Sequence, residues 1–289
     1  MSSLRVKAYA KVNLGLEVLG PRPDGYHEVV TVLQTVSLWD ELSVEKAETI
    51  SLECDDPTLS GPDNLVVRAA DAVLQAWGQK AGARIVLNKH IPTAAGLGGG
   101  SADAAAALKA LSQLWKARMP EETLRAVAGP LGTDVPFFLR GGTALAQGRG
   151  ERLTYLPPAR ALRMVLVVPP VFVPDKTRLL YSRLRPEHFS HGGRTKELAR
   201  SLQAGLPPPE ELMVNSFEQV AFQVFTGLEE AWNALERAGG GRVHLTGAGP
   251  SIFSLVTDQS AGQEIVARLL REGHRAYLLH VVNPAVTLR

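Results

Sequence analysis

The stretch from Pro92 to Ala107 carries the residues whose types and spacing most clearly indicate chemistry. Glycine has no Cβ atom, so several glycines together let the backbone adopt positive φ values and approach a ligand closely. The alanine-rich segment that follows has high helix propensity, and a helix start presents unpaired N–H groups and the positive end of a dipole. The stretch therefore predicts a loop that binds di- or triphosphates, the alternative being a flexible turn before a core helix. The glycines are Gly96, Gly98, Gly99 and Gly100.

Ser101 follows these glycines, and its hydroxyl has two alternative roles. It could cap the helix, or it could face Mg²⁺ or a phosphate in a nucleotide site. Two better-known phosphate-binding patterns do not fit this stretch. The dinucleotide pattern G-x-G-x-x-G would need glycine at position 101, and the P-loop pattern would need a lysine in place. The sequence thus predicts phosphate binding by another kind of glycine-rich loop.

Lys11 and Asp134 are charged residues in mainly apolar surroundings. Lys11 lies between Ala10 and Val12, whereas Asp134 belongs to a Gly-Thr-Asp-Val-Pro turn that leads into an apolar run. Considered alone, Asp134 is a turn residue and Lys11 a lysine on an edge strand. If the two met, the ammonium would favour the ionised carboxylate. The pair could then accept a hydroxyl proton and balance the charge of phosphoryl transfer.

The elements that must position these residues begin with strands. The first 46 residues hold four short segments rich in β-branched residues, with Gly-Pro and Asp-Gly turn signals between them. Apolar residues then recur at helical spacing from Asn64 to Gly78, and a strand over Arg84–Asn88 leads into the glycine loop. Helices are expected over Ala102–Leu114 and from Pro120 to Gly129. The four expected strands are Arg5–Tyr9, Asn13–Val18, Val29–Leu38 and Leu42–Glu45.

The second half mixes strands and helices without strict alternation, which favours the α+β class. One long helix is expected from Glu210 to Phe225. Because Pro157 and Pro158 follow the last strand of the first half, we expect two domains, 1–157 and 158–289. The strands expected in the second domain are Leu162–Val168, Val243–Thr246, Ile252–Val256 and Arg275–Val282.

The composition limits what the protein could do. The chain has 289 residues, 45% of them hydrophobic and 21% charged, which is the balance of an ordinary globular protein. Its net charge of +2 is too small to indicate a nucleic-acid or membrane partner. Cys54 is the only cysteine, which excludes an intramolecular disulfide and a cysteine-rich metal site. We find neither a signal-peptide pattern nor an apolar run long enough to span a membrane, and therefore expect a cytoplasmic protein.

Four motifs, in the same order, make the sequence resemble the GHMP kinases, a family of small-molecule kinases that includes galactokinase, homoserine kinase and mevalonate kinase. The triple glycine after Gly96-Leu97 is most similar to the branch that acts on 4-diphosphocytidyl-2-C-methyl-D-erythritol. The sequence departs from the family at Ala94 and Ala95, where glycine is common, and at Ala102, where a second serine is common. The motifs are Ala10–Leu16 with Arg22–His27, the glycine loop, Leu131–Phe138 and Leu245–Ser251.

The resemblance implies a fold and a reaction. The fold would have an amino-terminal domain like the second domain of ribosomal protein S5 and a ferredoxin-like carboxy-terminal domain. The reaction would transfer a phosphoryl group from ATP, with Mg²⁺, to the 2-hydroxyl of 4-diphosphocytidyl-2-C-methyl-D-erythritol on the route to isoprenoid precursors. Asp134 would be the catalytic base and Lys11 its partner. Gly247 and Gly249 of the last motif would close around the substrate or the glycine loop, the alternative being a tight turn between two strands.

The resemblance also implies binding roles. Tyr26 would stack on the cytosine and His27 would read its hydrogen-bonding edge, while Asn13 and Asp134 would contact the acceptor. Ser101 is a candidate Mg²⁺ contact, and the Val173–Thr177 segment is assigned no role. The residues implied for ATP are Asn64, Leu65, Lys89, Pro92, Thr93, Ala94, Ala95, Gly96, Leu97, Gly98, Gly99, Gly100, Ser101 and Ala102.

Three alternatives accompany this interpretation. A mevalonate or homoserine kinase would share the glycine loop but would have no reason to carry Asp24-Gly25-Tyr26-His27. A non-catalytic nucleotide-binding protein on the same fold would not need Lys11, Ser101 and Asp134 intact. A nucleic-acid binder is disfavoured because the chain has no basic run.

Overall fold

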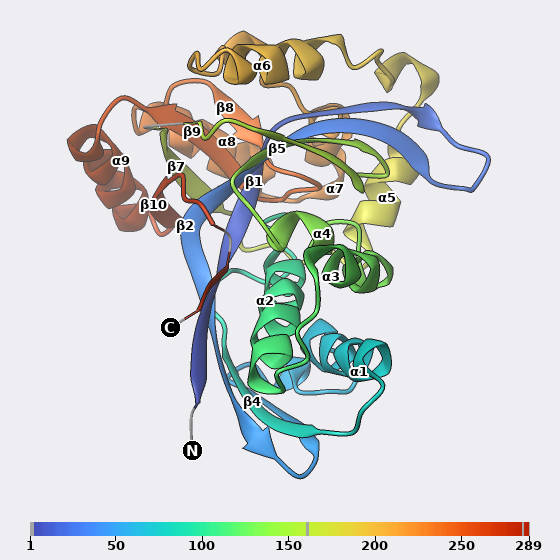
Figure 1. Cartoon of the computed structure of the whole chain (residues 1–289). Coiled ribbons are helices and arrows are strands. Elements are labelled where there is room, and N and C mark those ends of the chain that lie inside the picture. The colour runs from blue at the N-terminus through green and yellow to red at the C-terminus, as the bar shows by residue number, and fades with distance from the viewer. Residues whose placement is uncertain (1–2, 160–161, 285, 289) are drawn as a thin grey trace.

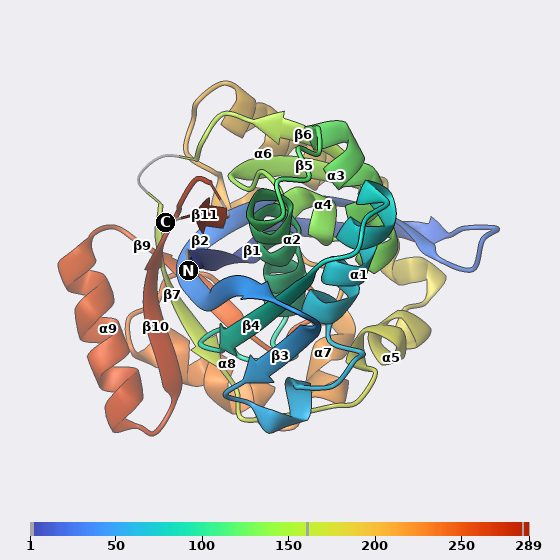
Figure 2. The same ribbon diagram turned by 60° about the horizontal axis from the view of Figure 1, so that its bottom comes forward.

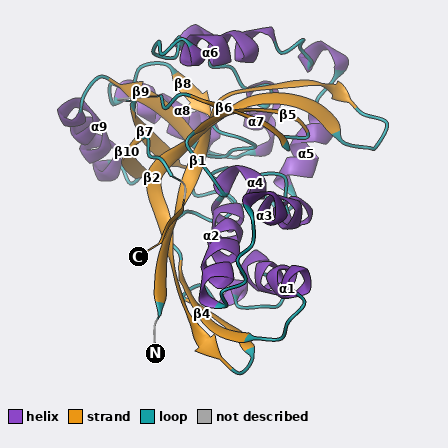
Figure 3. Cartoon of the chain, viewed as in Figure 1, coloured by secondary structure: helices purple, strands orange, loops and turns teal. Residues whose placement is uncertain are grey.

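The structure is a computed structural model that describes residues 3–159, 162–284 and 286–288. These residues form two β-sheets flanked by helices (Figure 1, Figure 3), which confirms the α+β class. The first sheet contains β1 (Leu4–Pro21), β2 (His27–Ala47), β3 (Ile50–Cys54), β4 (Gly82–Asn88), β5 (Thr143–Gly148), β6 (Arg152–Leu156) and β11 (Val286–Leu288). The second sheet contains β7 (Arg163–Val168), β8 (Val243–Leu245), β9 (Ile252–Val256) and β10 (Arg275–His280).

Strands β1 and β2 form one long antiparallel pair (Figure 1). The expectation of four short strands was wrong, because β1 has 18 residues and β2 has 21. Register shifts at Tyr9/Lys11, Asn13/Gly15 and Val18/Gly20 absorb the positions that interrupt the sequence pattern. Residues 10–18 of β1 are all buried. Polar side chains in this segment therefore point into the protein rather than to solvent.

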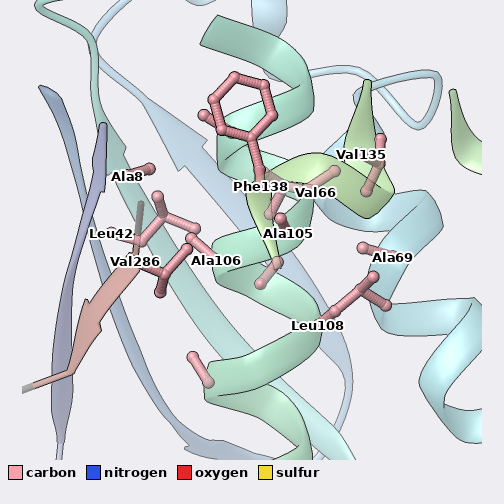
Figure 4. Packing of buried hydrophobic residues seen from close by; sticks show 14 of the residues in the cluster. Ala8, Leu42, Val66, Ala69, Ala105, Ala106, Leu108, Val135, Phe138 and Val286 are labelled. Atoms are coloured by element: carbon pink, nitrogen blue, oxygen red, sulfur yellow. The ribbon is translucent and has the colours of Figure 1, made fainter. Parts of the chain in front are cut away.

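Helix α2 (Gly99–Leu114) lies between the first sheet and α1 (Leu65–Trp77). Figure 4 shows Ala106 facing the sheet beside Leu42 and Val286, whereas Leu108 faces Ala69 of α1. Alanine side chains let the helix approach the sheet closely and favour helix formation at the same time. Two shorter helices, α3 (Glu121–Ala128) and α4 (Val135–Phe138), pack beside α2. This packing fixes the start of α2, where the glycine loop ends.

The second sheet has the strand order β10-β7-β9-β8 and is antiparallel throughout. Helices α8 (Leu228–Arg237) and α9 (Gln259–Arg271) pack against it and complete a β-α-β-β-α-β arrangement. This order confirms the ferredoxin-like prediction for the second half. Three more helices lie in the connection between β7 and β8, and α6 packs on β1 and β2. They are α5 (Lys176–Arg183), α6 (Gly193–Gln203) and α7 (Glu218–Val224).

The single helix expected from Glu210 to Phe225 is interrupted. A short 3₁₀ turn covers Glu210–Leu212, and α7 begins only at Glu218. Between them Asn215 forms a bridge to Leu16 of β1, and its side-chain amide donates to the carbonyls of Leu245 and Gly247, both at 2.9 Å. These tertiary hydrogen bonds take the place of helical ones. The spacing of apolar residues in the sequence could not reveal them, because it reports only local structure.

We propose that the two domains divide near residue 157. Strand β6 ends at Leu156, and β7, which starts the second sheet, begins at Arg163. The chain then returns at its end, because β11 pairs with β1, and Figure 2 shows the two termini on the same side of the molecule. The second domain is thus joined to the first at both of its ends.

None of the helices in the described ranges combines the length and apolar character that a bilayer crossing requires. Even α2 has only 16 residues, fewer than the roughly 20 that span a membrane. Its apolar side chains are buried against the sheet and α1.

Candidate active site

The glycine loop is held in its shape by two glycines with left-handed backbone. Gly96 has φ 84° and Gly98 has φ 72°, whereas Gly99 and Gly100 are the first residues of α2. Two of the four glycines therefore adopt the positive φ that glycine permits, and the other two are helical. A Cβ at Gly98 would lie 2.7 Å from the ring of Phe138, and one at Gly96 would lie 2.5 Å from the carbonyl oxygen of Thr246. Both positions thus require glycine for conformation and for space.

The backbone N–H groups at the start of α2 are not capped by a side chain. Gly98 is the N-cap residue and no side chain caps the helix, so of the two roles considered for Ser101 the capping role is excluded. Ser101 lies in the first turn instead, because the helix begins at Gly99, three residues earlier than expected. A cavity of about 380 Å³, here called the loop cavity, opens at this point, and Asn64, Leu65 and Lys89 line it together with residues 92–101. The structure thus brings together all the residues implied for ATP except Ala102, which is buried in α2.

Lys11 and Asp134 meet beside the glycine loop. The Nζ atom of Lys11 lies 3.9 Å from Oδ2 of Asp134 and donates a 2.5 Å hydrogen bond to Oδ1 of Asn13. The Asn13 amide in turn donates to the hydroxyl of Thr31 at 2.8 Å. The backbone N–H of Lys11 donates to the carbonyl of Leu97 at 3.0 Å, which ties β1 directly to the loop. Burial lowers the pKa of Lys11, and Asp134 opposes that shift.

A second cavity, here called the central cavity, surrounds this pair. Its volume is about 330 Å³, and its lining includes Lys11, Asn13 and Asp134. Gly96 and Gly98 line both this cavity and the loop cavity, so the two adjoin at the glycine loop. The only carboxylate in the described lining is that of Asp134, which can therefore act as a proton acceptor close to a bound phosphate.

Tyr26 and His27 line a third cavity of about 790 Å³, here called the hairpin cavity because Tyr26 lies in the β1–β2 turn. The His27 ring stacks on Tyr181 with 4.6 Å between ring centroids. The guanidinium of Arg149 lies 4.7 Å from the centre of the Tyr26 ring, which is 53% exposed. Burial lowers the pKa of His27, which favours the neutral imidazole with one donor and one acceptor.

Comparison with known proteins identifies the family. The model of the GHMP kinases N terminal domain matches residues 64–142, and that of the GHMP kinases C terminal matches residues 194–275. A 4-diphosphocytidyl-2-C-methyl-D-erythritol kinase of Dehalococcoides mccartyi is 41% identical over 97% of this chain and 99% of its own length. The same-named protein of Pelotomaculum thermopropionicum is 41% identical over 96% of this chain and 97% of its own. The chain belongs to this GHMP kinase family.

Solved structures agree with this family. A crystal structure of 4-(cytidine 5'-diphospho)-2C-methyl-D-erythritol kinase superimposes with a TM-score of 0.81 at 40% identity, covering 96% of this chain and 98% of that one. A homoserine kinase from Cytophaga hutchinsonii has a TM-score of 0.77 at 22% identity, covering 100% of this chain and 98% of its own. The second likeness shows the shared GHMP kinase fold alone.

The third glycine motif of this GHMP kinase lies against the glycine loop. Gly247 and Gly249 have φ values of 56° and 59°, which make a tight turn after β8. The N–H of Ser251 donates to the carbonyl of Ala95 at 3.3 Å, and a Cβ at Gly247 would lie 3.1 Å from Nζ of Lys11. The motif is therefore a tight turn that packs on the glycine loop, and Gly247 also lines the central cavity. Its closing around a substrate stays a prediction.

Lys89 makes contacts that the sequence did not indicate. Its ammonium lies between the carboxylates of Asp40 and Asp103, and it donates to the latter at 2.6 Å. Asp40 is fully buried and accepts from the backbone N–H groups of His90 and Ile91. Burial raises the pKa of Asp103 to about 8, and Lys89 opposes that shift. Lys89 thus links β2, the end of β4 and the first turn of α2 beneath the loop cavity.

Asn64 also has a structural role. Its Oδ1 accepts from the N–H of Val66 at 2.8 Å and so caps α1, and its amide donates to the carbonyl of Leu59. The cap places Leu65 at the wall of the loop cavity.

The residues of the central cavity that the sequence interpretation missed include Arg149, Lys176 and Tyr181. Arg149 lies between Gly148 and Gly150 in the β5–β6 turn, so its place between two glycines was an available signal. Lys176 begins α5 and belongs to the Val173–Thr177 segment, for which no role was expected. Only the tertiary fold brings α5 to the Lys11 side of the molecule.

Proposed function

We propose that the chain transfers the γ-phosphoryl group of ATP to the 2-hydroxyl of 4-diphosphocytidyl-2-C-methyl-D-erythritol, with release of ADP. The observation that carries this proposal is the meeting of Lys11 and Asp134 in a cavity that adjoins both the glycine loop and the Tyr26–His27 cavity. Relatives at about 40% identity over nearly the whole chain carry the name of this activity. The reaction belongs to the methylerythritol phosphate route to isoprenoid precursors, and we place it in the cytoplasm, where its small charged substrates are made.

ATP is the phosphoryl donor, as in other GHMP kinases. Its phosphates fit the open start of α2, where the N–H groups of the first turn and the helix dipole favour an anion. Its adenosine fits the remainder of the loop cavity beside Asn64 and Leu65. In this arrangement the γ-phosphate points past Gly96 and Gly98 into the central cavity, towards Asp134.

Asp134 accepts the proton of the acceptor hydroxyl as the oxygen–phosphorus bond forms and the bond to ADP breaks. Its side chain is 34% exposed, so a hydroxyl can reach it, while the side chain of Lys11 is only 6% exposed. Lys11 is fixed by Asn13 and orients the carboxylate while it balances charge on the transferring group. Asn13 can hold Lys11 in place because its own amide is bound by Thr31.

Mg²⁺ fits this site as a partner of ATP rather than of a protein cage. Among the described residues no group of three or more His, Cys, Asp or Glu side chains could hold a metal ion. Mg²⁺ bound to nucleotides usually keeps several waters and takes its other ligands from phosphates and one or two side chains. The hydroxyl of Ser101, which lines the loop cavity, is a side-chain oxygen that could complete such a set. When bound, the ion would neutralise charge on the phosphates.

The acceptor is selected by the hairpin cavity. A cytosine can pack on the exposed Tyr26 ring, and the neutral imidazole of His27 offers it one donor and one acceptor. Mevalonate and homoserine have no base to place there.

The test is the rate of ADP formation from ATP with each of three acceptors. The proposal predicts turnover with 4-diphosphocytidyl-2-C-methyl-D-erythritol and only background with mevalonate or homoserine. Turnover of either sibling acceptor at a comparable rate would reassign the substrate. A complete lack of turnover, with ATP still bound, would point to the non-catalytic alternative.

A further inference from the structure

The hairpin cavity and the central cavity share one stretch of wall. Five residues line both of them, so these residues stand where the two cavities join. Two of the five carry a positive charge and none carries a negative one. The shared residues are Thr133, Arg149, Lys176, Thr177 and Tyr181.

Neither cation at this junction forms an ion pair with a carboxylate that the structure describes. Within the described ranges of the chain, no carboxylate lies at ion-pair distance from Arg149 or Lys176. Arg149 rests over the Tyr26 ring, and Lys176 donates to the backbone carbonyls of Ala248, at 3.1 Å, and Gly249. Burial, and then the charge of nearby Lys11, lower the pKa of Lys176 to about 7. Because Arg149 and Lys176 form no ion pair among the described residues, the junction leaves room for an anion that would stabilise both of them.

We infer that Arg149 and Lys176 form the binding site for the diphosphate of the acceptor, an inference that rests on the proposed function. The acceptor carries its diphosphate between the cytidine and the branched tetrol. The cavities follow the same order, with Tyr26 and His27 on one side of the junction and Lys11 and Asp134 on the other. The diphosphate diester has two negative charges, which the two cations match.

The side chains of Arg149 and Lys176 can bind a diphosphate in different ways. A guanidinium can donate two parallel hydrogen bonds to phosphate oxygens, while an ammonium acts as a compact charge. The hydroxyls of Thr133 and Thr177 line the same junction and can donate further hydrogen bonds. With the diphosphate fixed there, the length of the acceptor places its tetrol beside Asp134. The junction therefore specifies a nucleoside diphosphate derivative rather than a free alcohol.

The inference is tested by calorimetric binding of cytidine and of CDP to the whole chain, in wild type, Arg149→Gln and Lys176→Met. Wild type is expected to bind CDP more tightly than cytidine. Each substitution should lower the CDP-to-cytidine affinity ratio about tenfold, the loss typical of one charge-assisted hydrogen bond, with cytidine affinity nearly unchanged. Arg178→Gln is the matched control, because Arg178 lines the hairpin cavity but not the junction. It should leave the ratio as in wild type.

The possible outcomes distinguish failure of the diphosphate site from failure of the proposed substrate. If wild type discriminates CDP from cytidine and both variants keep the same ratio, the diphosphate site is overturned while the proposed substrate stands. If wild type binds neither cytidine nor CDP, the proposed substrate falls and the site with it. Equal losses in Arg178→Gln would also overturn the inference, since they would show a diffuse effect of charge. ATP affinity checks that each variant is folded, and the exposed position of Arg149 makes its variant informative even if Lys176→Met is unstable.

Discussion

The ammonium of Lys11 lies 3.9 Å from the carboxylate of Asp134, and only the acid is open to solvent, with 34% of its side chain exposed against 6% for the lysine. A cation that is buried and held by Asn13 cannot follow the substrate, so it acts as a fixed charge. The acid has the freedom to reach a hydroxyl. This asymmetry is what a proton acceptor with a fixed electrostatic partner requires.

Replacement of Asp134 by Asn should lower turnover by about 10²–10⁴-fold, the usual contribution of a positioned base. The fold should survive, because Asp134 is the N-cap of α4 but its side chain makes no capping hydrogen bond. Steady-state kinetics measures the loss of turnover, and urea denaturation measures whether the fold is as stable as in wild type. Turnover close to wild type would remove Asp134 from the mechanism, whatever the stability of the variant.

Gly98→Ala should destabilise the protein by about 1–2 kcal/mol and weaken ATP binding, because its left-handed backbone disfavours a Cβ atom. The new Cβ would also lie 2.7 Å from the Phe138 ring. Gly100→Ala is the matched control. It is helical, and its new Cβ would meet only Leu65 at 3.8 Å, so stability should not fall. Equal urea midpoints for the two variants would contradict the structural account of the loop.

The sequence was most informative where local composition decides structure. Glycines followed by alanines predicted both the loop and α2, because propensity and close packing act in the same direction there. It was least informative where distant segments meet. The bulges that join short strand patterns into β1, the break at Asn215 and the Asp40–Lys89–Asp103 contacts all depend on tertiary hydrogen bonds. Lys176 reached the site in the same way, through the placement of α5 rather than through any motif.

Affinity for the cytidylated acceptor should fall as pH rises from about 7 to 9. With its pKa lowered to about 7, Lys176 is mostly neutral above that pH in the free enzyme, whereas a bound diphosphate favours its ammonium form. Binding must then be accompanied by proton uptake, which weakens it by up to about tenfold per pH unit. Calorimetry without ATP measures how the affinity for the acceptor changes with pH. In Lys176→Met this pH dependence should be smaller.

The charged and titratable groups that face Lys176 bear on that measurement. In the central cavity they are Lys11 from β1, Asp134 at the start of α4, Arg149 from the β5–β6 turn and Tyr181 on its own helix. In the hairpin cavity, which Lys176 also lines, they include His27, Asp175 and Arg178. Burial raises the pKa of Tyr181 to about 12, so this residue stays neutral in the range. Burial lowers the pKa of Lys11, so Lys11 could contribute a similar dependence on pH. A pH dependence that persists in Lys176→Met would assign the proton uptake to another group.

Tyr26 and His27 should determine which base the enzyme accepts. Tyr26→Ala is expected to raise the KM for the acceptor by roughly tenfold to a hundredfold, the loss of one aromatic stack of about 1–3 kcal/mol, with the KM for ATP nearly unchanged. Tyr26→Phe keeps the ring and is the matched control, so its KM should stay near that of wild type. Since the guanidinium of Arg149 covers one face of Tyr26, the base has the other face available.

His27→Phe separates stacking from hydrogen bonding. The new ring can keep the contact that His27 makes with Tyr181 at 4.6 Å, but it offers no donor or acceptor to the base. Discrimination between the cytidine acceptor and its uridine analogue should therefore fall, because a site with paired polar groups rejects a base that leaves them unpaired. The ratio of kcat/KM for the two acceptors measures this. An unchanged ratio, together with a normal KM in Tyr26→Ala, would remove the base-recognition role from the hairpin cavity and leave only the broader GHMP kinase activity.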